Sequence, residues 1–268
     1  MRTTPKILWL GILAVLGTAS PGLPQAALTA DQVMEKNFYA AKVKTLKADS
    51  DLVLINAQGD KRVRKVSNLQ ALQPNGVDSK LLVKFLDPAD IRGTGFLQIE
   101  HSDADDDQWV YLPALQKSRR LVANNKKDSF FGSDFSYGDI TLPKPKAYVN
   151  TLKGSQAVDG IDCYVVESVP ASESLKEDTG YGKKVSWIRK DDFIEAKVEY
   201  YDLSGQLLKV QVTGGVTKAG SNPDRYLVAH REMDNVQTGH KTTLDFTHVQ
   251  TGVAVDDGVF STRSLERQ

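Results

Sequence analysis

"DLVLINAQGDKRVRKVSNLQAL", residues 51–72, consists of two runs of alternating side chains on either side of a short turn, Gln58-Gly59-Asp60. Alternation with a period of two places one set of side chains on each face of a β-strand. The connection is too short for a crossover, so the two strands are expected to pair antiparallel. The stretch therefore predicts a β-hairpin and a mainly β fold.

The same pattern recurs along most of the chain. "KLLVKFLDPADIRGTGFLQIEH", residues 80–101, predicts a second hairpin around a turn that contains proline and glycine. Further strands are predicted in QWVYLP, QKSRRLV, KAYVNTLKG, DCYVVESVP, KKVSWIRK, FIEAKVEYYD, QLLKVQVTGGV, RYLVAHREMDN and KTTLDFTHVQT. Many short strands separated by turns favour a curved antiparallel sheet, a barrel or a sandwich over a βαβ fold.

Two segments have helical patterns instead. Thr29 is followed three places later by Gln32, which is a capping-box pattern. An apolar stripe at helical spacing then runs through Ala30, Met34, Phe38 and Ala41. "VFSTRSLER", residues 259–267, predicts a short final helix.

The amino-terminal segment has the composition of a secretory signal peptide. Arg2 and Lys6 precede the apolar run "ILWLGILAVLGTA", which is shorter than the roughly 20 residues of a membrane span. Cleavage after Ala19, Ala26 or Ala27 would fit the pattern. We therefore expect a signal peptide over residues 1–27 and one exported, soluble domain over residues 28–268.

Charge and cysteine content exclude several classes of protein. Without Arg2 and Lys6 the chain carries 32 basic against 34 acidic residues, a balance that argues against nucleic-acid binding. The single cysteine, Cys163, rules out an internal disulfide framework and lies too far along the chain to be an amino-terminal lipid anchor. Its apolar strand predicts a buried, inert thiol.

Aromatic residues are concentrated in "DQWVYLPALQKSRRLVANNKKDSFFGSDFSYGDI", residues 107–140. Trp109 and Tyr111 lie on one face of their predicted strand, and Val110 and Leu112 lie on the other. Both faces are therefore apolar or amphipathic. One face could line an apolar cavity, or both could simply be packed.

The segment "FFGSDFSYGD" predicts a loop, because Gly132 and Gly138 permit tight turns. Phe131, Phe135 and Tyr137 could reach inward from this loop as a lid over an open barrel, or pack on one another in an Ω-loop.

Arg119 and Arg120 are adjacent in a predicted strand and therefore point to opposite faces. One of them could bind a phosphate or an acidic partner. The alternative is an ion pair with Asp134 or Asp139, or plain solvation.

The sequence departs from the motifs of enzymes and metal sites that it partly resembles. "SDADDD" resembles a calcium loop, but Gln108 replaces the required glycine and Ala114 the closing glutamate. "GTGFLQ" lacks the third glycine of a dinucleotide fingerprint, and the histidines have no metal-binding spacing. No enzymatic activity, cofactor or metal is expected.

The order "QWVYLP", "QKSRRL" and "FFGSDFSYGDI" resembles the LolA-like family of outer-membrane lipoprotein-sorting proteins. The resemblance implies an unclosed β-barrel with a helical lid, whose cavity shields acyl chains of a lipoprotein or lipid in the periplasm. It also implies a partner in an inner-membrane exporter of the RND or MMPL type, and an outer-membrane acceptor. The implied cavity and lid residues are Met34, Phe38, Phe96, Trp109, Tyr111, Phe131, Phe135 and Tyr137.

Two classes of function remain open at this point. The first is the carrier, with Arg119 and Arg120 as candidate contacts to a head group or a partner. The second is a periplasmic adaptor subunit that uses the same fold to dock to an exporter or an outer-membrane complex. A hollow apolar cavity would favour the carrier, and a filled cavity with an exposed aromatic patch would favour the adaptor.

Overall fold

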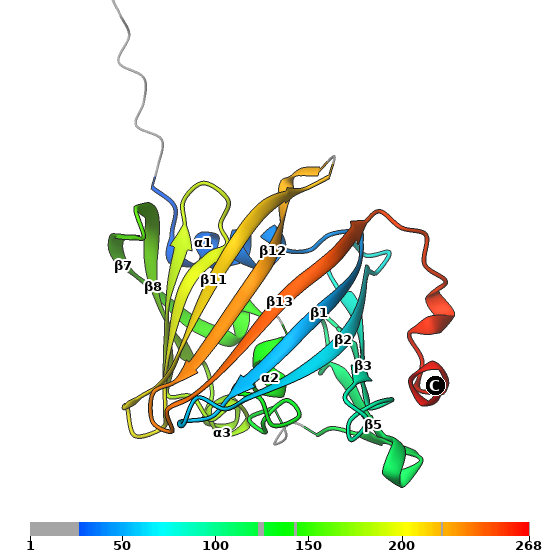
Figure 1. The fold of residues 1–268 in the computed structure, drawn as a ribbon. Helices are drawn as coiled ribbons and strands as arrows, with labels where there is room; N and C mark the ends of the chain where they lie inside the picture. The colour runs from blue at the N-terminus through cyan, green and yellow to red at the C-terminus, as the bar shows by residue number, and fades with distance from the viewer. Residues whose placement is uncertain (1–26, 123–125, 142–143, 221, 268) are drawn as a thin grey trace, which may run out of the picture.

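The strands of the described chain form one antiparallel sheet that curves into an open half-barrel (Figure 1). The structure is a computed structural model that describes residues 27–122, 126–141, 144–220 and 222–267. The expected signal peptide falls almost entirely outside these residues. The mainly β, unclosed half-barrel predicted from the sequence is confirmed.

Each predicted run corresponds to one strand, although the first strand begins at Thr45, six residues before the run that starts at Asp51. The strands are β1 (Thr45–Ile55), β2 (Lys61–Leu72), β3 (Ser79–Asp87), β4 (Gly95–Ile99), β5 (Asp107–Leu112), β6 (Lys117–Arg120), β7 (Tyr148–Val158), β8 (Ile161–Pro170), β9 (Lys183–Arg189), β10 (Glu195–Tyr201), β11 (Leu207–Ala219), β12 (Asn222–Asn235) and β13 (His240–Thr251). The helices are α1 (Ala30–Ala40), α2 (Tyr137–Ile140), α3 (Glu173–Thr179) and α4 (Thr262–Glu266), with 3-10 turns η1 (Pro113–Leu115), η3 (Pro145–Ala147) and η4 (Asp257–Val259).

The sequence patterns did not predict two short helices, α2, which begins within the predicted loop, and α3. Helix α3 is the longer of the two. It has only 7 residues, begins at a Ser172 cap and ends at Gly180, which has a positive φ of 75°. A helix of two turns is too short to establish an apolar period, so its signal does not stand out from a polar loop.

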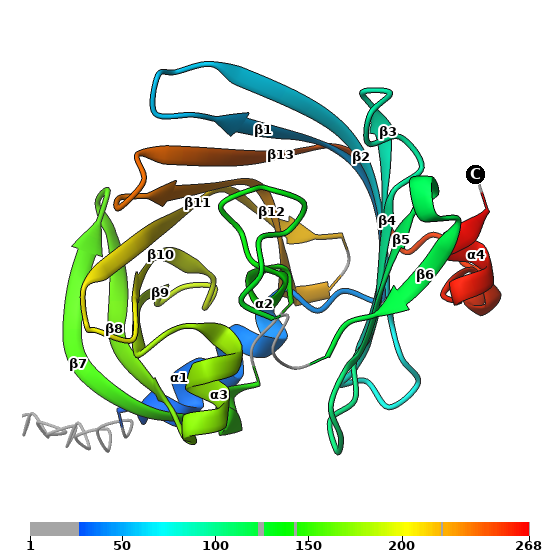
Figure 2. The ribbon, with the colours of Figure 1, turned by 90° about the horizontal axis from the view of Figure 1, so that it is seen from below.

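The strand order explains the open shape. The sheet runs β6-β5-β4-β3-β2-β1-β13-β12-β11-β10-β9-β8-β7, so the first and last strands pair at its centre. Leu52 of β1 lies opposite Leu244 of β13 in this pair. The two free edges, β6 and β7, are consecutive in the chain, and the segment that joins them must cross the open side of the half-barrel (Figure 2).

Alternation along each strand divides the core between the two faces of the sheet. Val83, Phe96 and Val110 point to the concave face and belong to the main apolar cluster. Their neighbours Leu82, Leu97 and Tyr111 point to the convex face, where they pack with Phe260 and Leu265. The sheet is therefore buried on both sides in the region of β3, β4 and β5.

The convex face is covered near β4, β5 and β6 by the carboxy-terminal segment, whose helix α4 lies outside the curve of the sheet (Figure 2). Leu265 of α4 is fully buried. A Cβ atom on Gly95 would lie 2.6 Å from Leu265 Cδ1, so glycine in β4 permits this close approach.

Helix α1 lies inside the curve and begins at the predicted capping box. The Thr29 hydroxyl accepts a hydrogen bond from Gln32 N, and Thr29 N donates to Gln32 Oε1. Val33 and Met34 pack on Val166 of β8 and Ile188 of β9.

A buried ion pair fixes the carboxy-terminal end of α1 to the sheet. Lys42 Nζ lies 2.7 Å from Glu100 Oε2, and the two side chains are 1% and 4% exposed. Lys42 Nζ also donates to Val77 O and lies 3.9 Å from the centroid of the Phe38 ring. Burial lowers the pKa of Lys42, although the Glu100 carboxylate opposes this effect.

Glu100→Gln is expected to lower the free energy of unfolding by about 3 kcal/mol, because it leaves the Lys42 ammonium buried without a counter-charge. Urea unfolding at neutral pH measures the change. Glu173→Gln is the matched control, since the Glu173 side chain is 81% exposed and should change stability by less than about 0.5 kcal/mol. Equal losses in both variants would contradict the anchoring role of the buried pair.

Candidate functional site

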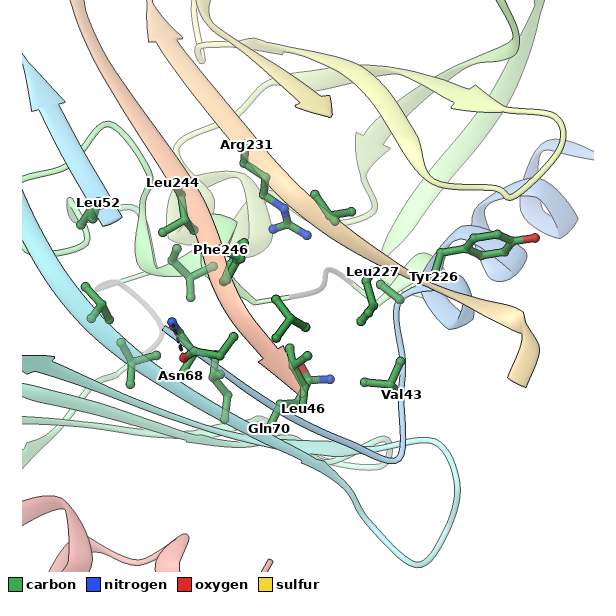
Figure 3. A pocket seen from close by; sticks show the side chains of 18 of the residues that line it. Val43, Leu46, Leu52, Asn68, Gln70, Tyr226, Leu227, Arg231, Leu244 and Phe246 are labelled. Carbon is green, nitrogen blue, oxygen red and sulfur yellow. Dashed lines mark hydrogen bonds between the residues drawn. The ribbon is translucent and has the colours of Figure 1, made fainter. Parts of the chain in front are cut away.

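An apolar cavity of about 150 Å³ opens on the concave face of the sheet (Figure 3). Its walls come from both halves of the sheet and from the segment that crosses the open side. The apolar lining residues include Leu46, Ala48, Leu52, Val66, Leu81, Val83, Phe130, Ile140, Leu227, Val228, Leu244, Phe246 and Val249.

The period of two explains most of this lining. Leu46, Ala48 and Leu52 are spaced by even numbers along β1 and so share one face. Leu244 and Phe246 do the same on β13. Because β1 and β13 pair with each other, these side chains form one continuous apolar wall.

A few polar groups interrupt the apolar lining. The Asn68 side-chain amide donates a hydrogen bond to Ser50 Oγ at 2.8 Å, so this group is satisfied within the sheet. Arg231 of β12 also lines the cavity, and its guanidinium points toward the cavity in Figure 3. Its Nε atom is buried and has no hydrogen-bond partner among the described residues.

The open side is crossed by residues 126–141, here termed the lid segment, which ends in the short helix α2. Phe130 lies at the centre of an aromatic cluster that joins the lid segment to the sheet. Its ring centroid is 5.5 Å from that of Phe96, 4.9 Å from that of Phe131 and 5.4 Å from that of Tyr137. Phe131 in turn packs edge-on against Phe85 of β3, with centroids 4.8 Å apart.

The tip of the lid segment has a left-handed backbone at two successive residues. Phe131 has φ 50° and Gly132 has φ 81°. Glycine adopts this region freely, but for a bulky residue such as phenylalanine it costs on the order of 1–3 kcal/mol. Packing of the Phe131 ring against Phe85 and the other rings must offset this cost.

Polar contacts hold the lid segment to three strands. Lys209 Nζ of β11 donates to Asp134 O at 2.9 Å and lies 2.6 Å from Asp139 Oδ2. Thr242 Oγ1 of β13 accepts a hydrogen bond from Asp134 N at 2.9 Å. Arg64 of β2 donates to the Phe131 carbonyl.

Asp139 and Lys209 form an ion pair that is almost completely buried, with side chains 1% and 6% exposed. Burial alone would raise the pKa of Asp139, but the Lys209 charge and hydrogen bonds hold it below its ordinary value. The Tyr181 hydroxyl adds a hydrogen bond of 3.0 Å to Asp139. Burial raises the pKa of Tyr137 to about 12, so the ring beside this pair stays neutral.

The structure brings four of the candidate residues together. Phe131, Phe135 and Tyr137 lie in the lid segment, and Phe96 lies beneath them in the same apolar cluster. Phe130, which was not among the candidates, is the aromatic residue of the lid segment that lines the cavity. Phe135 is 1% exposed and packs within the cluster.

Other candidates lie away from this cavity. Trp109 and Tyr111 point to the convex face, where they pack beneath the carboxy-terminal segment. Met34 of α1 packs on β8 and β9, and Phe38 lines a separate opening beside α1. Alternation correctly placed Trp109 and Tyr111 on a common face, but that face is the outer one, because Val110 occupies the concave side.

The two arginines have different environments on the edge strand β6. Arg119 is exposed, whereas Arg120 forms an ion pair with Asp107 of β5. The suggested pairing with Asp134 or Asp139 is wrong, because Thr242 and Lys209 bind these two residues instead. The Cys163 thiol is buried as predicted, and burial raises its pKa.

Several functional groups gave little signal in the sequence. Arg64, Lys209 and Thr242 each sit in an ordinary alternating strand, and only the tertiary structure directs them at the lid segment. The cavity wall on β1 and β13 could have been suspected from alternation. The pairing of these two strands could not, because they are separated by most of the chain.

Comparison with known proteins identifies relatives over nearly the whole chain. A family model described as that of an uncharacterized protein matches residues 77–267. No curated protein matches the sequence. Within the described residues, the helices are too short or too polar to cross a lipid bilayer.

Three solved structures are similar in fold. A DUF1329 family protein from Desulfovibrio piger is 28% identical, with a TM-score of 0.80 over 88% of this chain and 97% of that chain. A domain from Vibrio parahaemolyticus named for outer membrane lipoprotein sorting is 28% identical, with a TM-score of 0.79 over 89% and 98%. A LolA superfamily protein from Nitrosomonas europaea is 20% identical, with a TM-score of 0.68 over 89% and 100%, and it shows the shared fold.

Asp139→Asn is expected to loosen the lid segment, because it leaves the buried Lys209 ammonium without its counter-charge. The Phe130 amide, which donates to Phe135 O, should exchange its hydrogen roughly a hundredfold faster than in the wild type. Hydrogen exchange at neutral pH measures this. Asp159→Asn in the exposed β7–β8 turn is the matched control and should leave the exchange rate unchanged.

The same pair predicts a pH dependence. The pKa of Asp139 is lower in the folded protein than its ordinary value of 3.8, so the stabilisation is complete above pH 3.8 and is lost as the pH falls through the folded value. The difference in unfolding free energy between wild type and Asp139→Asn should therefore be constant near neutral pH and shrink in acid. A difference that grows as the pH falls would contradict the assignment.

Proposed function

Because the chain belongs to the LolA-like family of outer-membrane lipoprotein-sorting proteins, we propose that it is a periplasmic carrier that shields the acyl chains of a lipoprotein or lipid. The observation that carries the proposal is the apolar cavity on the concave face, covered by an aromatic lid segment. Such a cavity can remove an acyl chain from water through apolar contacts alone, without a specific polar contact to the chain.

The energetics of acyl binding favour this role. Each methylene transferred from water to an apolar cavity gains about 0.8 kcal/mol. The cavity volume of about 150 Å³ is below the roughly 300–1,000 Å³ of a typical ligand pocket. Cargo must therefore displace part of the lid segment, whose rings occupy the concave face in the described state.

Displacement of the lid segment also offers a route to release. When an acyl chain displaces aromatic rings of the lid segment from the core, the rings lose their apolar contacts and the acyl chain takes their place. The net binding energy is then smaller than the acyl chain alone would give. A partner can shift such a balanced equilibrium with a limited difference in affinity between the two states.

We further propose that an inner-membrane transporter of the RND or MMPL type delivers the cargo and that an outer-membrane component accepts it. These partners follow from the family resemblance in residues 108–139. The role is non-enzymatic in this proposal, because the cavity presents apolar side chains with few polar groups. Phe131, Phe135 and Tyr137 are proposed as lid residues on the same basis.

The adaptor alternative has less support. An adaptor would be favoured by an exposed aromatic patch, whereas Phe130, Phe135 and Tyr137 are all buried. Native mass spectrometry of protein purified from an envelope extract separates the two functions. A co-purifying acylated species is expected for the carrier.

Phe246→Asp is expected to weaken uptake of a fluorescent fatty-acyl probe by about tenfold or more, because it places a carboxylate in the apolar wall of the cavity. Titration of the probe followed by fluorescence measures the dissociation constant. Val212→Asp is the matched control. Val212 is partly exposed and follows Gln211, whose side chain is on the concave side, so Val212 points to the convex face.

The control should bind the probe as the wild type does. Wild-type protein that is empty on purification and also fails to take up the probe would overturn the carrier proposal. The adaptor would then be the better hypothesis.

A further inference from the structure

A second, polar chamber of about 50 Å³ lies beside the apolar cavity, toward α1 and the β8–β12 half of the sheet. Its lining includes the charged residues Asp139, Lys184, Glu195 and Arg231, together with Tyr200 and Gln211. A cluster of charges on the inside of a sheet is unusual, because desolvation of each charge is costly. No step of acyl-chain binding uses these groups.

The polar chamber and the apolar cavity are neighbours that share one lining residue and are divided by one helix. Arg231 lines both of them, and its guanidinium enters the apolar side in Figure 3. Helix α2 separates them, with Ile140 lining the apolar cavity and Asp139 lining the polar chamber. The two spaces are therefore neighbouring compartments, one apolar and one charged, that share a single arginine.

The charges of the polar chamber do not cancel within the described residues. Asp139 is matched by Lys209 at 2.6 Å. Lys184 and Arg231 then remain against the single carboxylate of Glu195, which is hydrogen-bonded by the Ser186 hydroxyl at 3.3 Å. Burial raises the pKa of Glu195, although the Lys184 and Arg231 charges oppose this effect.

Lys184 is surrounded by aromatic rings, and no carboxylate of the described residues forms a close ion pair with it. Its Nζ atom lies 4.8 Å from the ring centroid of Tyr148, 5.6 Å from that of Tyr200 and 5.8 Å from that of Tyr181. Burial opposes its charge, but the Tyr148 hydroxyl and the carboxylates of Asp139 and Glu195 raise the pKa of Lys184. It is therefore a fixed ammonium at neutral pH.

Arg231 has unused hydrogen-bonding capacity at the boundary. Its buried Nε–H has no acceptor in the part of the chain that the structure describes, and a buried donor without a partner is costly. A guanidinium presents parallel N–H donors that match the oxygens of a carboxylate or phosphate. An anion placed between Arg231 and Lys184 would satisfy the donor and balance the charge.

We infer that the polar chamber receives the anionic head group of a cargo whose acyl chain lies in the apolar cavity, with Arg231 and Lys184 as head-group ligands. The cargo class is then an anionic amphiphile that carries a carboxylate or a phosphate. This inference rests on the proposed carrier function and narrows it. A neutral acyl chain alone would leave the chamber charges unmatched.

The test compares probes that share an oleoyl tail and differ in the head group: oleate, oleoyl lysophosphatidate and the neutral methyl oleate. Displacement of a fluorescent acyl probe gives the dissociation constant for each. Wild-type protein should bind both anions at least about tenfold more tightly than the neutral ester, because hydrogen bonds to charged groups are the stronger ones. Tighter binding of oleate identifies a carboxylate head, and tighter binding of the phosphate identifies a phosphate head.

Arg231→Gln should weaken binding of the two anions by much more than binding of methyl oleate, because it deletes the charge that only the anions use. Lys184→Gln should reduce the preference in the same direction. Arg231→Lys, which keeps the positive charge, should retain part of the preference for the anionic probes. The thermal midpoint of each variant checks folding, and the wild-type comparison decides the question if a variant fails to fold.

Equal affinity of wild type for the ester and both anions would overturn the inference and leave the carrier function intact. So would an equal loss for all three probes in Arg231→Gln. Failure of all three probes and of a triacylated lipopeptide to bind the wild type would instead overturn the carrier function itself. The two failures are thus distinguishable.

Discussion

The pairing of β1 with β13 is the contact on which the arrangement of the molecule depends. It joins the two ends of the β region at the centre of the sheet, with Leu52 opposite Leu244. Consecutive strands then extend outward on each side and end at β6 and β7. Because these edges are adjacent in sequence, the chain between them has to bridge the open side. The strand order therefore accounts for the position of the lid segment across the open side of the half-barrel.

The lid segment is held by two kinds of interaction with different consequences. The rings of Phe130, Phe131 and Tyr137 pack on the concave face beside the cavity, and in the proposed carrier an acyl chain could replace such contacts because apolar burial is not directional. The Lys209–Asp139 pair is directional and buried, so it fixes the position of the segment over the sheet. In the proposed carrier, the lid segment would give up its apolar contacts to cargo, and this pair would define the closed geometry.

The interior of the half-barrel is divided according to polarity. The wall formed by β1, β2, β3 and β13 is apolar, whereas the half nearer α1 contains Lys184, Glu195 and Arg231. Helix α2 lies on the boundary between the two. An amphiphile has the same division between tail and head group. Under the proposed carrier function, an apolar cavity with a charged end would orient an amphiphilic cargo as well as shield it.

The sequence by itself determined the elements that depend on local patterns. Alternation specified every strand from β1 to β13, and the Thr29–Gln32 capping box specified the start of α1, because both signals act over a few residues. The motif in residues 108–139 indicated the family. Alternation could not decide which face of β5 turns inward, since Trp109, Val110 and Tyr111 suit either side. Only the tertiary structure decided this, because the carboxy-terminal helix covers Trp109 and Tyr111 on the convex face. The cavity wall and the buried charges around α2 likewise arise from residues far apart in the chain, which meet only when β1 pairs with β13 and the lid segment crosses the opening.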